Sequence, residues 1–131
     1  MVKWDETLAT GFKEIDRHHQ ILLERLELLI DQMRQGKGRQ EIDKTIQFLG
    51  DYARMHFAME EQYMEQVHCP AALLNKAQHH RFLENFNRLS ARIRQEGNNT
   101  ALVLEVQRTL SDWVVNHILE IDLQMKKYAR D

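Results

Sequence analysis

His56-Phe57-Ala58-Met59-Glu60 places an imidazole and a carboxylate four residues apart within a stretch that otherwise predicts an amphipathic helix. Residues four apart on an α-helix lie on the same face, one turn above the other. The apolar members of this face recur at steps of three and four, as Ile42, Ile46, Leu49, Ala53, Tyr63 and Val67. His56 and Glu60 therefore point into the interior, where an unpaired polar group is costly. Another group or an ion must satisfy them there.

Three further segments carry an apolar stripe with helical spacing, so that four helices are expected. We predict them over residues 16–35, 39–66, 70–95 and 101–128, after an irregular arm over 1–14. Turn residues at 36–38 and 97–99, and Pro70 as a first helical residue, separate them. β-Branched alternation is absent and the connections are short. The sequence therefore predicts one all-α domain over 1–131, an antiparallel up-down-up-down four-helix bundle.

Composition narrows the class of protein further. The 131 residues carry a formal net charge of −2 with both signs interspersed, so we expect neither a nucleic-acid nor an anionic-membrane partner. No apolar run approaches the roughly 20 residues that span a bilayer, and no signal-peptide core is visible. Cys69 is the only cysteine, which fits a reducing compartment. We expect a cytoplasmic protein, and a monomer.

The polar members of the four stripes share one level of the bundle. His19 lies near the start of the first helix, and His56 with Glu60 near the end of the second. Asn75 and His79 lie near the start of the third, and His117 near the end of the fourth. In an antiparallel bundle these places meet at the same end. We interpret the layer as a metal site, with a buried polar network as the alternative.

Asp122 is a less obvious member of this layer. It follows His117 by five residues, about 140° round an ideal helix. Both side chains could face the core only if the helix contains a π-type bulge there or tilts so that they straddle the centre. On spacing alone, Asp122 could equally be a solvated surface residue.

The donor types limit the choice of metal. Imidazoles with carboxylates and without thiolate suit iron, manganese or zinc. Two carboxylates among several imidazoles fit two metals, with each carboxylate spanning the pair. The ferritin-like di-iron bundles use Glu-x-x-His instead, and that pattern is absent at this level. The sequence therefore argues against the ferritin-like class.

These residues resemble the hemerythrin family, and myohemerythrin is a familiar example of this bundle topology. The resemblance covers nearly the whole chain. It includes Trp4 and Gly11, Ile15-Asp16-Arg17-His18-His19, His56 through Glu61, His79, and Trp113 through His117 to Asp122. It implies two non-haem iron ions bridged by carboxylates and by an oxo or hydroxo group. Glu60 and Asp122 would be the bridging carboxylates, with His19 and His56 on one iron and His79 and His117 on the other.

The third helix departs from the family pattern. The family has His-x-x-x-His there, whereas this chain has Asn75 and His79. An amide oxygen suits iron less well than imidazole does. Asn75 could ligate weakly, water or another side chain could take its place, or that iron could bind poorly. We interpret His18 and His80 as surface or outer residues because each points about 100° away from its neighbour.

The resemblance implies reversible binding of O₂, or of a related small diatomic molecule or peroxide, for oxygen transport, storage or sensing. A first alternative is a slow di-iron oxidase or peroxidase that uses the coordination position opened at Asn75. A second alternative is an iron-storage or zinc-holding bundle without oxygen chemistry. The sequence does not identify a redox partner.

Overall fold

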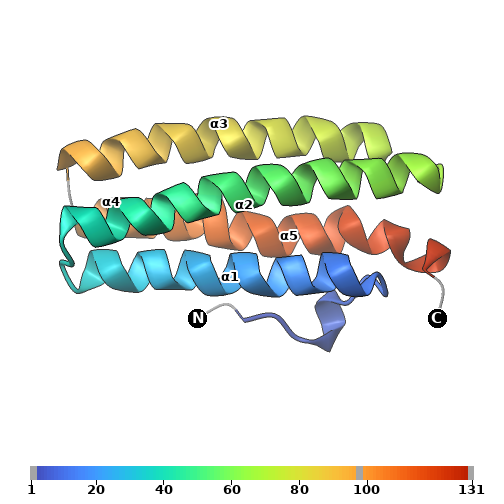
Figure 1. Ribbon diagram of the computed structural model, residues 1–131, viewed down its shortest axis with the longest axis horizontal. Helices are drawn as coiled ribbons and strands as arrows, with labels where there is room; N and C mark the ends of the chain where they lie inside the picture. Colours follow the sequence, from blue (N-terminus) through green and yellow to red (C-terminus); the bar gives the residue numbers. More distant parts are fainter. Residues whose placement is uncertain (1–2, 97–98, 130–131) are drawn as a thin grey trace.

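The computed structural model describes residues 3–96 and 99–129, which form helices and turns without β-strands (Figure 1). An arm with a short 3₁₀ helix, η1 (Glu6–Leu8), precedes three long helices, α1 (Lys13–Arg34), α2 (Arg39–Gln66) and α3 (Ala72–Glu96). The fourth rod contains α4 (Thr100–Val106), η2 (Gln107–Ser111), α5 (Asp112–Glu120) and η3 (Asp122–Tyr128). Consecutive rods run in opposite directions, which confirms the predicted antiparallel four-helix bundle.

The turns show why α1 and α2 end, and α3 begins, where they do. Gly36 has φ 66°, a left-handed conformation that suits glycine, and it ends α1. His68 has φ 56° and reverses the chain after α2. The N–H of Ala72 then donates to the carbonyl of Cys69 at 3.0 Å, which closes a tight turn. Because this turn includes Pro70, α3 begins at Ala72 and not at the expected residue 70.

The fourth rod is not the continuous helix that we expected over 101–128. The side chain of Asn99 caps its start by accepting from the N–H of Leu102 at 2.7 Å. The segment η2 is π-helical, and the N–H of Asp112 donates to the carbonyl of Gln107, five residues back. The α-helix then ends at Glu120, and η3 continues as a 3₁₀ helix. Two segments of this rod therefore depart from α-helical pitch.

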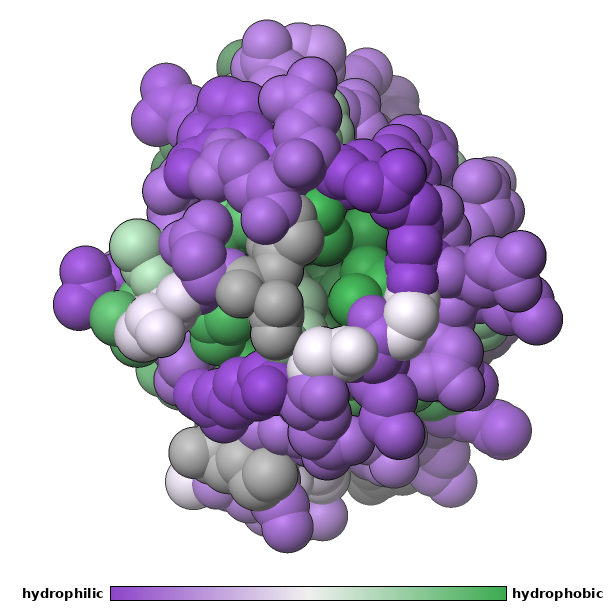
Figure 2. Space-filling model, turned by 90° about the vertical axis from the view of Figure 1, so that its left-hand side faces the viewer, coloured by the Kyte–Doolittle hydropathy of each residue, from purple (hydrophilic) through white to green (hydrophobic). Residues whose placement is uncertain are grey.

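Apolar side chains fill the interior along most of the length of the bundle, among them Leu26, Leu29, Leu49, Leu89 and Leu102. Figure 2 faces the end formed by the α1–α2 turn and the start of α4, where hydrophobic side chains are visible inside a hydrophilic rim. None of the helices in the described residues has the length and apolar character needed to cross a membrane. The polar interior layer lies toward the opposite end.

Candidate metal centre

The structure brings all six predicted site residues into one buried layer. They are His19, His56, Glu60, His79, His117 and Asp122. Their exposed fractions lie between 0% for Glu60 and 4% for His117. Four different rods contribute them, as the sequence predicted from the directions of the helices. Such a concentration of imidazoles and carboxylates is unusual in a helical core, because each group loses its hydration.

Two donor clusters can be distinguished within the layer. In the first, the Nε2 atom of His19 lies 3.2 Å from Oε2 of Glu60 and 3.1 Å from Oδ2 of Asp122. The Nε2 atom of His56 lies 3.4 Å from the same Oε2. Four donor residues from three rods therefore face one small volume, which we call the first position.

The second cluster uses the other oxygen of each carboxylate. The Nε2 atom of His79 lies 3.1 Å from Oε1 of Glu60, and that of His117 lies 3.2 Å from Oδ1 of Asp122. The two Nε2 atoms of His79 and His117 lie 3.1 Å apart. We call this volume the second position. Glu60 and Asp122 thus each present one oxygen to each position, the arrangement of a carboxylate that spans two cations.

The donor set fits a bound cation better than it fits a network of hydrogen bonds. Oε1 of Glu60 and Oδ1 of Asp122 are fully buried, yet neither accepts a hydrogen bond among the described residues. Their neighbours are close in distance but do not point an N–H at them. Two imidazole nitrogens at 3.1 Å also require a proton or a cation between them. Carboxylate and imidazole donors suit iron, manganese or zinc.

Asn75 lies inside this layer, at the second position. Its side chain is fully buried, and its Oδ1 atom lies 2.7 Å from Nε2 of His117. Its Nδ2 group has no hydrogen-bond partner among the described residues. The amide therefore offers an oxygen to the second position. The hemerythrin-family pattern for the third helix has a histidine at this place.

Asp122 reaches the core by a route other than the bulge that we considered. The π-helical segment η2 lies earlier, at Gln107–Ser111, and not between His117 and Asp122. The N–H of Ile121 still donates to the carbonyl of His117 at 2.8 Å, but Ile121 has φ −113° and the 3₁₀ helix η3 follows. This change of pitch turns Asp122 inward, where it is 1% exposed. The alternative of a solvated Asp122 is wrong.

Three acceptors behind the imidazoles hold the ring orientations. Nδ1 of His56 lies 3.1 Å from Nδ1 of His18, Nδ1 of His79 lies 2.9 Å from Oε2 of Glu61, and Nδ1 of His117 lies 2.7 Å from Oε1 of Gln78. We call His18, Glu61 and Gln78 the outer acceptors. With Nδ1 engaged, each ring presents Nε2 to the layer, as metal-binding histidines commonly do.

The outer acceptors were the main omission of the sequence analysis. Neither Glu61 nor Gln78 was predicted to contact a donor ring. His18 was placed at the surface or behind the site, and it is 7% exposed against His56. One signal was available in the sequence, because each outer acceptor is adjacent to a predicted donor: His18 to His19, Glu61 to Glu60 and Gln78 to His79. His80 is exposed, as expected.

Aromatic rings cover the second position. Phe57 stacks on His79 with ring centroids 3.8 Å apart, and Trp113 stacks on His117 at 4.5 Å. Phe57 and Trp113 also meet each other at 6.2 Å. The rings fix both imidazoles and cover them with apolar surface, which limits the access of water.

The donors shift one another's pKa values. Burial opposes a charge on His19, but the hydrogen bonds and charges of Asp122 and Glu60 outweigh it and raise the pKa of His19 to about 10. Burial would likewise raise the pKa of Glu60, yet the close imidazoles of His19, His56 and His79 hold that pKa well below its usual value. For His56, burial dominates and lowers the pKa.

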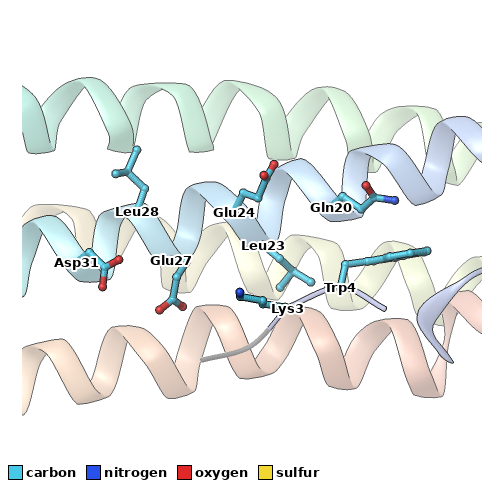
Figure 3. A pocket seen from close by; sticks show the side chains of 8 residues that line it. All are labelled: Lys3, Trp4, Gln20, Leu23, Glu24, Glu27, Leu28 and Asp31. Carbon is cyan, nitrogen blue, oxygen red and sulfur yellow. The ribbon is translucent and has the colours of Figure 1, made fainter. Parts of the chain in front are cut away.

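One surface groove lies elsewhere and contains none of the six predicted residues. It has a volume of about 560 Å³ and lies between the N-terminal arm and α1. Lys3 and Trp4 form its wall on the arm, and Leu23, Glu24 and Leu28 are among the α1 residues opposite (Figure 3). The candidate metal centre is therefore an enclosed layer and not an open cleft.

A four-helix bundle with paired histidine clusters that share two buried carboxylates defines a class of helical, cation-binding proteins. Within that class, the family model described as "Hemerythrin HHE cation binding domain" matches residues 10–129. The chain belongs to the hemerythrin family. This confirms the resemblance that we stated from the sequence, and with it the presence of a cation-binding domain.

Curated relatives agree with the family assignment. The chain is 34% identical over 119 residues to a bacteriohemerythrin of Pseudomonas paraeruginosa, with 91% of this chain and 75% of that protein covered. It is 33% identical over 119 residues to one of Pseudomonas aeruginosa, with the same coverage. A bacteriohemerythrin of Clostridium acetobutylicum is 27% identical over 129 residues, with 93% of this chain and 96% of that protein covered.

Proposed function

We propose that this chain holds two non-haem iron ions and binds O₂ reversibly, for oxygen transport, storage or sensing. The observation that carries the proposal is the sharing of both buried carboxylates between two histidine clusters, with one oxygen of Glu60 and of Asp122 in each. Membership of the hemerythrin family supports it. A single cation would leave one cluster of buried donors unsatisfied, whereas two cations use every donor.

In this proposal, each residue has a defined role. Glu60 and Asp122 bridge the two positions. His19 and His56 complete the first position. His79 and His117 complete the second, with the amide oxygen of Asn75 beside them. A ferrous pair held by these residues would supply the reversible electron transfer that O₂ binding needs.

The surrounding side chains favour binding over consumption of O₂. Phe57 and Trp113 stack on the two imidazoles of the second position and exclude bulk water from it. Exclusion of water protects a reactive centre from proton-dependent side reactions. The outer acceptors Glu61 and Gln78 hold the same two rings from behind.

A second candidate function rests on Asn75. An amide oxygen binds iron less strongly than imidazole, so the second position has a ligand that is easily displaced. A displaceable ligand allows O₂ or peroxide to reach iron directly and favours oxidase or peroxidase turnover. The two functions differ in the use of reductant, because an enzyme consumes it continuously whereas a carrier cycles without it.

The first experiment is anaerobic reconstitution with ferrous iron, followed by elemental analysis and absorption spectra on admitting and removing O₂. We expect two irons per chain and an absorption band that appears with O₂ and disappears on its removal. Zinc-loaded protein is the control and should show no such band. A band that forms only with steady loss of added reductant would support the enzyme instead.

Two further results would reject the oxygen-binding proposal. One iron or none per chain would show that the layer does not hold a pair. Two irons with identical spectra in aerated and anaerobic samples would identify a metal-holding bundle without oxygen chemistry.

A further inference from the structure

We propose that His18 is a positioning residue that fixes the tautomer and orientation of His56, and thereby the affinity of the first position for its cation. This inference rests on the proposed function, because it requires a cation at Nε2 of His56. His18 is not among the six predicted site residues. It was expected at the surface or behind the site, and the structure places it against a candidate ligand ring.

The contact between the two rings leaves little freedom in the placement of protons. Nδ1 of His18 and Nδ1 of His56 lie 3.1 Å apart, so one carries a hydrogen and the other accepts it. A cation at Nε2 of His56 requires the proton of that ring to be on Nδ1. Nδ1 of His56 is then the donor and Nδ1 of His18 the acceptor. His18 must therefore be neutral, with its own proton on Nε2.

The surroundings of His18 accommodate this tautomer. The ring lines an open surface groove of about 550 Å³ between α1 and α2, with Arg17, Ile21 and Tyr52 among the other lining residues. With Nδ1 directed at His56, the Nε2–H faces the groove side, where solvent can accept it. Edge-on ring contacts with Tyr52 at 5.5 Å and with His56 at 5.2 Å hold the plane of the ring.

His18 differs from the other outer acceptors in one respect. Glu61 and Gln78 present oxygens, which accept from a protonated Nδ1 and have no tautomer of their own that would remove the acceptor. The Nδ1 atom of His18 accepts only when the imidazole is in one of its two neutral forms. The first position therefore depends on a nitrogen acceptor, and the second depends on two oxygen acceptors.

Three variants test whether His18 acts by accepting a hydrogen bond from His56 or only by filling space. His18→Gln keeps an acceptor at this place, His18→Leu removes it, and His80→Gln is the matched control because His80 is exposed. Zinc(II) is titrated against a competing chelator, with the two positions resolved by ¹⁵N spectra of labelled histidines. Loss of an outer partner commonly weakens metal binding by about 10–100-fold.

We expect His18→Leu to weaken zinc at the first position by that factor while the second position is unchanged. His18→Gln should stay within about threefold of the unmodified protein, and His80→Gln should have no effect. Equal affinity in His18→Leu and the unmodified protein would overturn the proposal. Equal losses in His18→Leu and His18→Gln would also overturn it, because the acceptor would not be the cause.

The unmodified protein gives a test that does not depend on the folding of any variant. In zinc-loaded protein, the ¹⁵N spectrum should show a protonated Nδ1 on His56 and an unprotonated Nδ1 on His18. The reverse assignment would overturn the positioning role. Failure of the unmodified protein to bind zinc at all would instead count against the proposed cation pair, so the two failures are distinguishable.

Discussion

At the level of single residues, Asn75 differs in kind from the other donors around the second position, because its donor is an amide oxygen, 2.7 Å from Nε2 of His117. Replacement by histidine supplies an imidazole, which ferrous iron prefers. We expect Asn75→His to hold the second iron about tenfold more tightly, or about 1.4 kcal/mol. The rate of iron loss to a chelator measures the change.

Asn75→Leu is the matched variant, since it fills similar space without a donor. It should lose the second iron faster than the unmodified protein does. If both substitutions left the rate of iron loss unchanged, Asn75 would not be a ligand. The O₂-dependent absorption band should also decay more slowly in Asn75→His.

His19 leads to a prediction about protons. Its pKa of about 10 keeps the ring charged at pH 8, whereas a cation requires the neutral ring. Loading with zinc at pH 8 should therefore release about one proton from His19. Calorimetric titration in buffers with different ionisation enthalpies measures this release. His19→Ala should release about one proton fewer, and an unchanged count would contradict the raised pKa.

Five of the six donors were predictable from the sequence because each interrupts an apolar stripe at a computable height along its helix. Asp122 lies off its stripe, and only the family resemblance indicated it. The outer acceptors were not predictable in the same way. His18, Glu61 and Gln78 each lie off the stripe, and their partners are on the next helix along the chain. Whether such a residue contacts a neighbouring ring depends on the rotation and spacing of two packed helices, which periodicity does not determine.

At the level of elements, the change of pitch at Ile121 controls the position of one carboxylate. Insertion of one alanine between Glu120 and Ile121 would turn Asp122 by roughly 100° about the rod. We expect this insertion to remove Asp122 from both positions and to reduce cation binding from two per chain. Elemental analysis after reconstitution measures the result.

A control insertion belongs in the turn between α1 and α2, beside the exposed Lys37. It lies at the other end of the bundle and should leave two cations per chain, because short surface turns tolerate insertions. If the insertion before Ile121 also left two cations, the inward orientation of Asp122 would not matter for binding.

The same rod shows what periodicity misses at this scale. An apolar stripe through Leu102, Val106, Leu110 and Trp113 predicted a single helix. The structure has the same stripe but contains a π-helical turn and a 3₁₀ segment. A π-helical or 3₁₀ turn rotates the following residues by only a fraction of a turn. Large apolar side chains still reach the core after such a rotation, so the apolar spacing in the sequence shows no interruption.

At the level of the whole molecule, the polar layer makes stability depend on bound cations. Removal of a cation leaves buried carboxylates and imidazoles without full compensation. A cation present at a hundred times its dissociation constant stabilises the fold by about 2.7 kcal/mol. For a chain of this size, that corresponds to roughly 10 °C in Tm per position. Calorimetric unfolding with and without chelator measures the difference.

The variant with both His56→Ala and His117→Ala removes one ring from each position and serves as the control. Its Tm should respond little to the chelator. A large response in this variant would show that the chelator acts elsewhere.

The fold as a whole was predictable from four apolar stripes and short turns. These features are repeated over many residues, so an error at one position does not change the predicted fold.

The N-terminal arm and the placement of the outer acceptors together determine where small molecules can pass to the buried layer. Rings on α2, α3 and α5 each have an outer acceptor on the preceding helix, but Nδ1 of His19 on α1 has no partner among the described residues. η1 packs against α5, and Asp16, which precedes His19 in α1, fixes the arm by accepting from Thr10 and Gly11. We expect permeation to be fastest beside His19, past this arm. Asp16→Ala should speed oxygen quenching of tryptophan fluorescence and cation exchange alike, without altering the equilibrium affinity of either position.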